Sequence, residues 1–439
     1  MKNLLIWCTL IKNLIIGIDG GCFESINPLL KRRLLPTFHK IIQNGFSSIL
    51  KVSIPPVTIP SWPCLFSGMT PEQLGYYWFD HPQKGLFNSI KWRDFSIFSN
   101  LDLKIFALNV PGTYPAWKIN GEMISGMLSP AISCFPPELK FFIKKDWIID
   151  GKNPNDIFKA FEIKNRLFLA KLKENFNLLV YVIRVPDGLT HTTHLSSEEV
   201  FNYINLGYKN IDKFLGDVLN SKIFDNILIF SDHGIKIYRH EFNMRRWLEK
   251  KGLLFINQSK ANKIYSIIAK IFDIFRPFIR IDYRKYNLLK KSILSKIVKE
   301  PSSTQEKKNE TRVLHFYGNV GGLYLKSEDK FKKEKIKREL EKDKKIKEVL
   351  SYELEGFPDL FIVLNEKYIF NHNSSYFVIR GRNSINHSQY GFFIAYGKDI
   401  KKGKSEIVNY DEIAPTILKL YGIHKKNHMM RDSLDIFKS

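Results

Sequence analysis

The sequence contains few cysteines and no apolar run of membrane-spanning length. Its four cysteines (Cys8, Cys22, Cys64 and Cys134) have neither the spacing of a metal site nor that of a disulfide framework. Cysteine zinc modules and disulfide-stapled folds are therefore excluded. No stretch reaches the roughly 20 consecutive apolar residues that a membrane-spanning helix needs. Reduced thiols without a membrane span predict a cytoplasmic protein.

Acidic residues are scarce relative to basic ones. The chain has 44 Asp and Glu against 68 Lys and Arg, which gives a formal net charge of +24. Residues 259–300 hold eleven Lys and Arg and three Asp and Glu, so a net charge of +8 lies in this one segment. A positive field favours partners that carry phosphate or anionic lipid, but it does not indicate a fold. The hydrophobic fraction of 44% is ordinary and predicts a sizeable core.

The first residues of the chain permit two interpretations. Residues 1–21 read MKNLLIWCTLIKNLIIGIDGG, in which a lysine precedes an apolar run as it does in a signal peptide. Lys12 interrupts that run, however, and no small-residue cleavage site follows it. The second half, Asn13–Ile18, is better explained as a buried strand that ends at Asp19. An export signal or membrane anchor is the alternative for this part of the chain.

Five short apolar runs end in polar or glycine-containing loops. Each run has the composition of a strand that is buried on both faces of a parallel sheet, and helical patterns such as 201–219 lie between them. Alternating strands and helices predict a doubly wound α/β fold, with a mostly parallel sheet and helices on both faces. Ligands of such sheets bind beyond the carboxyl ends of the strands. The runs cover residues 13–21, 104–112, 177–188, 226–234 and 391–397.

The pattern changes in the last third of the chain. Residues 259–377 hold two apolar helical stripes, and the charged stretch 325–350 is typical of a solvated helix. We therefore expect a core formed by 1–258 and 378–439 and an inserted cap formed by 259–377. The basic stripes in 261–300 fit a pair of cap helices, and they fit equally well an amphipathic pair in peripheral contact with an anionic membrane.

Thr58 lies in a proline-rich stretch that precedes a helical pattern. Pro56 and Pro60 flank it in PPVTIPSWPCLFSGMTPEQLG (55–75), and proline restricts the backbone on both sides of the hydroxyl. A threonine before a helix is most often an N-cap, which accepts a hydrogen bond from an early backbone N–H. A rigidly held hydroxyl is also suited to act as a nucleophile. The polar residues elsewhere in the chain decide between these two hypotheses.

Aspartate and histidine side chains follow the predicted strands or, in one case, directly precede the last one. Each taken alone would be an ordinary helix cap or surface residue. Because the carboxyl ends of parallel strands meet at one edge of a sheet, we expect these side chains to lie close together there. Mixed Asp and His ligands suit zinc or a similar divalent ion. The candidates are Asp19, Asp187, His191, Asp232, His233 and His387.

With these residues and Thr58, the chain resembles the type I phosphodiesterase/nucleotide pyrophosphatase branch of the alkaline phosphatase superfamily. The resemblance extends from Asn13 to about Asp432 and is weakest in 259–312. It implies a hydrolase of phosphodiester or pyrophosphate bonds that acts on a small phosphorylated substrate of nucleotide type, without an obligate protein partner. The stretches that carry it are IGIDGG, the Thr58 stretch quoted above, NVPGTYPAWKINGEMISGMLSP, VPDGLTHTTH, FSDHG and NHSQYGFFIAYG.

The resemblance also implies two divalent metal ions. Zinc is the first expectation, and manganese would accept the same ligands. The family arrangement activates the threonine hydroxyl for attack on phosphorus, so Thr58 is predicted to form a phosphothreonine intermediate. One ion would be held by Asp19, Asp232, His233 and the Thr58 oxygen, and the other by Asp187, His191 and His387.

The substrate contacts depart from the family pattern at one position. Eukaryotic members carry an asparagine just after the T-x-P, whereas this chain has Ser61, as prokaryotic relatives have a small residue there. Ser61 is predicted to contact the phosphate. Trp62 and Tyr76 are candidates for stacking on a base. The competing explanation for these aromatic residues is that they pack under the loop.

Other classes of function agree less well with the residues. Sulfatases of the superfamily need a cysteine or serine followed by proline and arginine, which the stretch 58–61 lacks. Phosphomonoesterases use a serine with a nearby arginine, and no arginine lies between Arg33 and Arg93. Hydrolysis of another phosphate or phosphonate ester class is the alternative within the superfamily. A basic membrane- or nucleic-acid-docking protein with a degenerate site is the alternative outside it.

Overall fold

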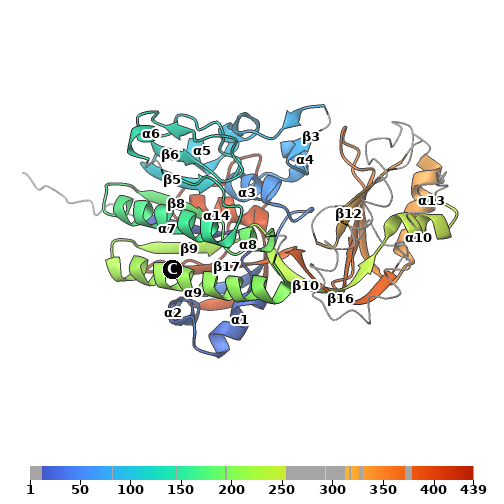
Figure 1. The fold of residues 1–439 in the computed structure, drawn as a ribbon. Helices are drawn as coiled ribbons and strands as arrows, with labels where there is room; N and C mark the ends of the chain where they lie inside the picture. The colour runs from blue at the N-terminus through green and yellow to red at the C-terminus, as the bar shows by residue number, and fades with distance from the viewer. Residues whose placement is uncertain are drawn as a thin grey trace, which may run out of the picture.

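A nine-stranded sheet forms the centre of the molecule (Figure 1), with the strand order β18-β2-β17-β9-β1-β8-β5-β6-β7. The computed structural model describes residues 12–438 apart from 82, 144–145, 193–194, 254–291, 293–311, 316–317, 326–329 and 371–377. The strands are β1 (Asn13–Ile18), β2 (Phe46–Lys51), β5 (Ile105–Val110), β6 (Gly121–Ser125), β7 (Cys134–Phe135), β8 (Leu178–Ile183), β9 (Asn226–Phe230), β17 (Tyr390–Gly397) and β18 (Gly403–Asn409).

The five apolar runs of the sequence form neighbouring strands in the middle of this sheet. β1 pairs in parallel with β8 and β9, and β5 pairs in parallel with β8. The last run, β17, is antiparallel to β9. Its orientation follows from its connection, because the chain enters β17 from a second lobe that lies beyond the carboxyl ends of the other strands. The predicted mostly parallel α/β fold is confirmed.

Helices cover both faces of the sheet. α1 (Phe23–Lys31), α2 (Pro36–Asn44), α7 (Pro154–Lys171) and α9 (Ser197–Ser221) pack on one face, and α3 (Thr58–Ser67), α5 (Ile97–Asn100) and α14 (Ile413–Lys419) pack on the other. β1 contributes side chains to the apolar core on both faces of the sheet, because successive side chains of a strand point to opposite faces. Leu14 and Ile16 contact the first set of helices, while Ile15 contacts the second.

Lys12 lies at the start of the described chain and is almost completely buried, with 7% of its surface exposed. Its Nζ donates hydrogen bonds to the carbonyl oxygens of Leu172 and Glu174, just after α7, at 2.9 and 2.7 Å. A cation is favourable there because the carbonyl groups at the end of a helix carry partial negative charge. Lys12 thus anchors β1, and the predicted strand Asn13–Ile18 is confirmed. Residues 1–11, and with them the export-signal alternative, lie outside the described residues.

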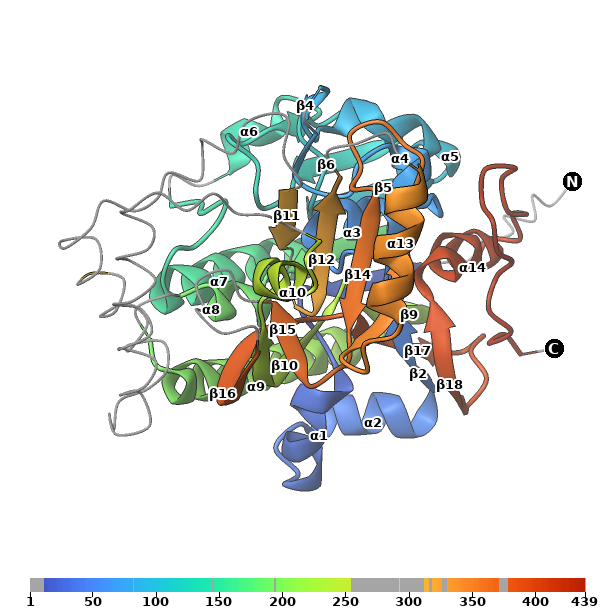
Figure 2. The same ribbon diagram turned by 90° about the vertical axis from the view of Figure 1, so that its right-hand side faces the viewer.

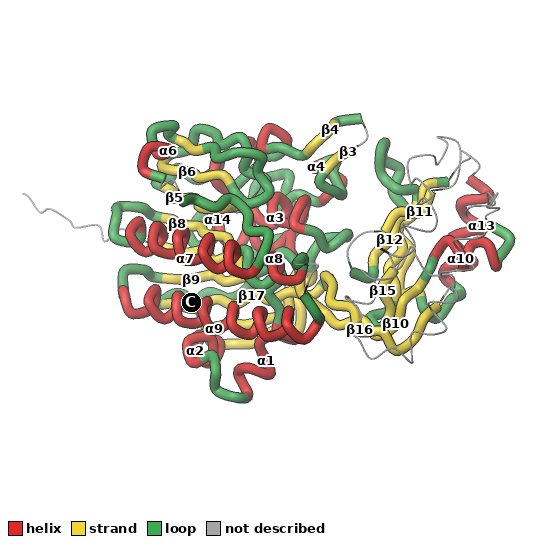
Figure 3. Tube along the Cα trace, viewed as in Figure 1, coloured by secondary structure: helices red, strands yellow, loops and turns green. Residues whose placement is uncertain are grey.

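A second lobe faces the carboxyl ends of the central strands, and Figure 2 shows it face-on. It consists of two sheets with the orders β15-β10-β16 and β11-β12-β14-β13, drawn in yellow in Figure 3. Its elements are β10 (Gly234–Phe242), α10 (Met244–Lys250), β11 (Arg312–His315), β12 (Val320–Tyr324), α13 (Lys330–Glu341), β13 (Ile346–Leu350), β14 (Leu360–Leu364), β15 (Tyr368–Phe370) and β16 (Val378–Ser388). α10 and α13 share one apolar core with this lobe.

The lobe differs from the sequence-based expectation in two respects. Its strands run from Gly234 to Ser388 and thus extend beyond both ends of the range 259–377, while the division of the chain into domains stays a prediction. The helix expected over 325–350 ends at Glu341, because Ile346–Leu350 pairs with β14 as a strand. The basic stripes of 261–300 lie outside the described residues apart from position 292, so membrane contact stays a prediction.

Short elements complete the core. Among the described residues, no helix combines the length and the apolar composition that crossing a membrane requires. The remaining elements are α4 (Pro71–Leu74), α6 (Leu139–Phe142), α8 (Asp187–Thr190), β3 (Asp80–His81), β4 (Gly85–Leu86) and the 3₁₀ turns Ser89–Lys91, Arg93–Phe95 and Tyr410–Glu412.

Tyr77 connects the core to the second lobe. Its ring lies 4.9 Å from that of Phe357 and 5.6 Å from that of Phe361, measured between centroids, in edge-on geometry. Its hydroxyl is 2.5 Å from the hydroxyl of Tyr324 on β12. Such aromatic pairs stabilise a contact beyond the area that they bury. The aromatic stretch after α4 therefore holds the lobe over the carboxyl edge of the sheet.

Candidate metal centre

The loops after the central strands bring the predicted ligands together. Asp19 follows β1, and Asp187 begins α8 a few residues after β8. The Asp19 N–H donates to the Ile183 carbonyl at 2.9 Å, and the Asp187 N–H donates to the Asp19 carbonyl at 3.0 Å. Gly20 adopts φ +75°, which favours glycine, and its N–H points to the Asp232 carboxylate at 3.3 Å. The backbone itself therefore fixes the relative positions of these carboxylates.

His387 reaches the same place from the second lobe. It lies on β16, which pairs antiparallel with β10 in a register that sets His387 opposite Ile235. His233 directly precedes β10, so the pairing also brings the two histidines together. Their rings stack with centroids 3.7 Å apart and an interplanar angle of 13°. The register of two strands outside the central sheet thus decides where His387 stands.

Asp187, His191 and His387 form one group that could hold a cation. The two Asp187 oxygens lie 3.1 Å from His191 Nε2 and 3.1 Å from His387 Nε2. The two histidine Nε2 atoms are 3.4 Å apart. Asp187 and His387 are buried, whereas 35% of the His191 side chain is exposed. The group is the one expected from the sequence, and it opens to solvent at His191.

Asp19, Asp187 and His233 form a second such group, with Asp232 beside it. His233 Nε2 lies 3.3 Å from Asp19 Oδ1, 3.5 Å from Asp232 Oδ2 and 4.0 Å from Asp187 Oδ1. All four residues are buried. The sequence-based ligand set did not include Asp187 here. The structure shows that its carboxylate lies between the two groups and contributes to both.

The orientation of the histidines fits a metal site. Nδ1 of His233 lies 3.1 Å from the Gly234 carbonyl oxygen, and Nδ1 of His387 lies 2.9 Å from that of Pro56. A carbonyl oxygen only accepts, so Nδ1 carries a proton in each ring, and Nε2 is the nitrogen that faces the carboxylates and can bind a metal once it is deprotonated. Both Asp19 oxygens and Asp232 Oδ2 are buried without a hydrogen-bond donor among the described residues. Acceptor atoms that face one another in this way fit a bound divalent cation.

The pKa values of the ligand candidates are shifted by burial and by the charges of their neighbours. Although burial opposes it, His191 and His387 hold the pKa of Asp187 well below its usual range. Burial and a neighbouring carboxylate raise the pKa of Asp232 well above its usual range. Burial also opposes ionisation of His233, yet Asp232 and the other carboxylates raise its pKa to about 10. Burial and the His233 charge lower the pKa of His387 to about 4. Without a cation, burial and the neighbouring charges therefore favour the protonated forms of Asp232 and His233 and the deprotonated forms of Asp187 and His387.

Thr58 does not serve as the N-cap that its sequence context suggests. Val57 occupies the N-cap position of α3, and no side chain accepts a capping hydrogen bond there. Ile59 has φ −113° and ψ 119°, because the residue before a proline avoids helical geometry, so the continuous helix begins after Thr58. Pro56 accepts the hydrogen bond from His387 and thereby ties this loop to the metal-ligand groups. The cap hypothesis for Thr58 is wrong.

Ser61 lies at the start of the continuous helix and is 1% exposed. Its hydroxyl is 3.2 Å from the hydroxyl of Ser53, which is also buried. The N–H groups at the start of a helix favour an anion. Contact between Ser61 and a phosphate therefore stays a prediction that agrees with its place beside Thr58.

Trp62 and Tyr76 are buried in the core, and this burial contradicts the expectation that they stack on a base. Both are 0% exposed. Trp62 stacks on Phe66 at 5.8 Å and occupies the space over Gly17 of β1, where an added Cβ would lie 2.4 Å from the indole ring. The Tyr76 hydroxyl donates to the Lys84 carbonyl at 3.2 Å. Both rings belong to the core, as the competing explanation held.

Replacing Trp62 with alanine should lower the free energy of unfolding by about 3–5 kcal/mol, because it leaves a large cavity between α3 and β1. Trp62→Phe should cost less because it keeps most of the ring volume. Denaturant unfolding of the metal-loaded protein measures both changes. An alanine variant of unchanged stability that binds a nucleotide more weakly would contradict this assignment and restore a role in stacking.

One charged residue near the site, Arg184, was not predicted from the sequence. Arg184 follows β8 directly and stands three residues before Asp187, with 15% of its side chain exposed. Its charge lowers the pKa of Asp19, against the larger effects of burial and of Asp187, which raise it. A cation at the end of a predicted strand, next to a candidate ligand, was the available signal.

Comparison with known proteins agrees with this geometry. The family model for type I phosphodiesterase/nucleotide pyrophosphatase matches residues 13–386. Murine ectonucleotide pyrophosphatase/phosphodiesterase 5 has 15% sequence identity and a TM-score of 0.55, over 97% of this chain and 100% of that chain. The human protein of that name has 16% identity and a TM-score of 0.56, over 98% and 100%.

One further solved structure is an inactive threonine-to-alanine variant of the murine protein in complex with AMP, with 15% identity and a TM-score of 0.55 over 98% and 100% of the two chains. No curated protein matches the chain. These structural likenesses show the fold, whereas the family match covers most of the chain, including Thr58 and all the ligand candidates except His387. The chain therefore belongs to the type I phosphodiesterase/nucleotide pyrophosphatase family, whose members are hydrolases.

Proposed function

We propose that the protein hydrolyses phosphodiester or pyrophosphate bonds of small, nucleotide-type substrates through a phosphothreonine intermediate on Thr58. The observation that carries the proposal is the meeting of three carboxylates and three histidines, with acceptor atoms facing one another, beside the loop that holds Thr58. A nucleotide is the preferred substrate class because of family membership and because the likeness to the murine protein extends to its AMP complex.

Two divalent ions, zinc or alternatively manganese, would be held by the two groups that share Asp187. When bound, such ions lower the pKa of a coordinated hydroxyl and neutralise charge on phosphate oxygens. The residues of the chain supply the rest. Pro56 and Pro60 hold the Thr58 backbone, and the hydrogen bond from His387 to Pro56 fixes the loop against the ligands. This positioning matters because a small misplacement of a nucleophile is costly in rate.

The reaction proceeds in two displacements on phosphorus. The Thr58 hydroxyl loses its proton, and its Oγ–P bond forms as the bond from phosphorus to the leaving oxygen breaks. The resulting phosphothreonine ester carries the nucleoside part of the substrate. Water then attacks the same phosphorus, the Oγ–P bond breaks, and Thr58 regains its proton. The product is a nucleoside monophosphate.

A panel of substrates tests this function with metal-loaded protein. ADP-ribose and the dinucleoside monophosphate ApA should be cleaved to AMP, whereas p-nitrophenyl phosphate, a monoester, should be cleaved slowly. Acid quenching during turnover should leave an adenylyl group on the peptide that contains Thr58, detectable by mass spectrometry. Cleavage of the monoester alone would contradict diesterase chemistry. Turnover without any adduct on that peptide would contradict the covalent intermediate.

A further inference from the structure

The backbone of His387 lies at the outer edge of a sheet in the second lobe. β16 is an edge strand, since the strand order of its sheet is β15-β10-β16. Ile235 stands opposite His387 on β10, but its N–H and carbonyl groups contact the Cys22 thiol, at 3.5 and 3.3 Å. Residue pairs in an antiparallel ladder alternate between exchanging both hydrogen bonds and exchanging none, and this pair exchanges none. The His387 N–H and carbonyl therefore need partners other than Ile235.

Tyr238, on β10, is the partner of the His387 carbonyl. Its hydroxyl donates to this oxygen at 2.6 Å, and Tyr238 is 1% exposed. Gly318, between β11 and β12, covers the same place. It has φ +69°, and an added Cβ would clash with the His387 carbonyl and stand 3.2 Å from the Tyr238 hydroxyl. The hydrogen bond is therefore enclosed by the lobe, where low dielectric strengthens it.

Asn386 is the partner of the His387 N–H. Its Oδ1 accepts from the His387 N–H at 2.9 Å and from the Gly318 N–H at 2.7 Å. Two backbone donors at one atom identify that atom as the amide oxygen, because the amide nitrogen only donates. A single side-chain oxygen thus joins His387 to the same loop that covers its carbonyl.

These contacts restrict the direction of the His387 ring. The backbone is held at its N–H and its carbonyl, and Nδ1 donates to the Pro56 carbonyl at 2.9 Å. Nε2 then faces Asp187 Oδ1 at 3.1 Å and His191 Nε2 at 3.4 Å. A ligand that already has its binding geometry loses less conformational freedom when an ion binds. The lobe therefore prepares one side of this group of ligands.

We propose that Tyr238 and Asn386 are positioning residues that hold the His387 backbone and thereby aim its ring at Asp187 and His191. The inference rests on the proposed function, because it requires that this group of ligands binds a divalent ion. It adds a role for two residues of the second lobe that lie outside the ligand set. Removing an outer partner of a metal ligand typically lowers metal affinity about 10- to 100-fold.

The test measures zinc binding by the full chain after treatment with a chelator, by calorimetric titration with zinc alone. Tyr238→Phe removes one oxygen and keeps the buried ring. We expect the affinity of one of the two zinc ions to fall about tenfold or more, and that of the other to change less than about threefold. Asn386→Ala should weaken the same ion. Because Asn386 is only half-buried, this second variant tests the proposal even where Tyr238→Phe fails to fold.

A double-mutant cycle shows whether the two residues act through His387. His387→Ala alone should weaken the same ion. In that background neither Tyr238→Phe nor Asn386→Ala should lower the zinc affinity further, because the side chain that they position is gone. A merely structural contribution would instead lower stability equally in both backgrounds.

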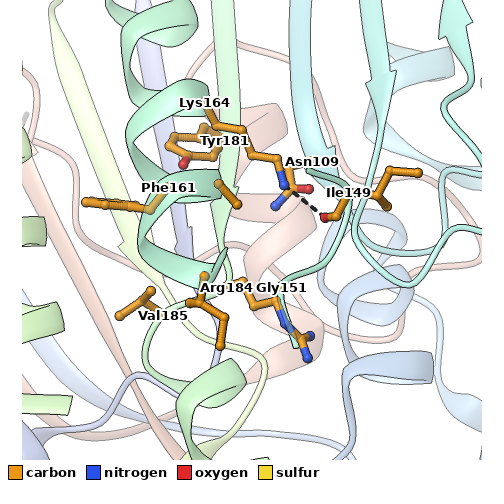
Figure 4. Close-up of a pocket in the computed structure, with 10 residues that line it drawn as sticks. Asn109, Ile149, Gly151, Phe161, Lys164, Tyr181, Arg184 and Val185 are labelled. Carbon is orange, nitrogen blue, oxygen red and sulfur yellow. Dashed lines mark hydrogen bonds between the residues drawn. The ribbon is translucent and has the colours of Figure 1, made fainter. Parts of the chain in front are cut away.

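Two other tyrosines serve as matched controls for Tyr238→Phe. Tyr181 is also 1% exposed, and it lines a small cavity with Lys164 inside the core (Figure 4). The Tyr421 hydroxyl also donates to a backbone carbonyl, that of Asn177 at 3.0 Å, just before β8 and thus at the opposite edge of the central sheet. Phenylalanine at either position should leave both zinc affinities unchanged.

The outcomes separate this inference from the function on which it rests. Zinc affinities within about threefold of the original in both Tyr238→Phe and Asn386→Ala would overturn the positioning role and leave the proposed function standing. A loss of equal size in the His387→Ala background would overturn it as well. An unchanged protein that binds no zinc would overturn the metal site and this inference with it. The expected losses in a protein that cleaves neither ADP-ribose nor ApA would support the positioning role and overturn the proposed function.

Discussion

Replacing Thr58 with alanine should lower kcat/KM by about 10⁴-fold or more, because it removes the nucleophile of the proposed reaction. The fold and the bound metal should be retained. Thr58 is 3% exposed and provides no cap to α3, so the loss of its hydroxyl and methyl should cost about 1 kcal/mol of stability. Steady-state kinetics on ADP-ribose, thermal unfolding and metal analysis of the same preparation measure the three quantities.

Thr70 offers a matched control in the same region. It is the N-cap of α4 and accepts a hydrogen bond from the Gln73 N–H at 3.3 Å. Thr70→Ala should therefore cost a similar amount of stability, about 1 kcal/mol, while turnover is kept. Thr58→Ser should keep part of the activity because it retains a hydroxyl. A Thr58→Ala protein that turns over at a tenth of the original rate would rule out covalent catalysis through this residue.

Replacing Asp187 with asparagine should affect both predicted metal ions. Its Oδ1 faces His387 at 3.1 Å and His233 at 4.0 Å, and its Oδ2 faces His191 at 3.1 Å. Asparagine has nearly the same shape, but it lacks the charge and carries an NH₂ donor in place of one carboxylate oxygen. We expect metal affinity to fall at least about 100-fold, more than the loss of an outer hydrogen-bond partner would cause. Activity should fall about 10³-fold or more, since electrostatic stabilisation at the phosphate is lost.

Metal binding can be measured without an activity assay. A metal that binds only the folded chain raises its stability, by about 2.7 kcal/mol at a concentration of 100 times Kd. Zinc added to chelator-treated protein should therefore raise the unfolding temperature, and this rise should be absent in Asp187→Asn. Asp212 is the matched control: it is 4% exposed and accepts hydrogen bonds from the N–H groups of Thr37 and Phe38 at 3.2 and 2.8 Å. Asp212→Asn should be less stable yet bind metal normally. Full metal occupancy in Asp187→Asn would overturn the shared role of Asp187.

Much of the fold follows from local sequence pattern. The run Asn13–Ile18 is apolar at every position but the first and the glycine, which predicts a strand covered on both faces, and it is the central strand of the sheet. The turn after this strand was also predictable from local sequence, because the residue that follows Asp19 is a glycine and its φ is positive. Asp187 and Asp232 likewise follow parallel strands. Their meeting was predictable because all such strand ends lie at one edge.

The sequence was less informative about the elements and side-chain positions that depend on long-range packing. The strand Ile346–Leu350 was expected to continue a helix, since its charged residues fit either structure and only β14 supplies the hydrogen-bonding partner. Trp62 and Tyr76 were assigned to the substrate because they stand near Thr58 in the chain. Their burial depends on Gly17 and on the Lys84 carbonyl, which the residues themselves do not indicate. Proximity in sequence does not fix the direction in which a side chain points.

The sequence by itself determined the α/β fold, the family, and the residues that could bind metal, because strand patterns and strand-end Asp and His residues are local features. The tertiary structure decided how these residues divide into groups. His387 meets Asp187 only through the register of β16 on β10, and Asp187 is shared because the β1 and β8 loops are joined backbone to backbone. Contacts of this kind depend on pairings between segments far apart in the chain. A residue type can indicate a ligand, but only the folded backbone sets which atoms face one another.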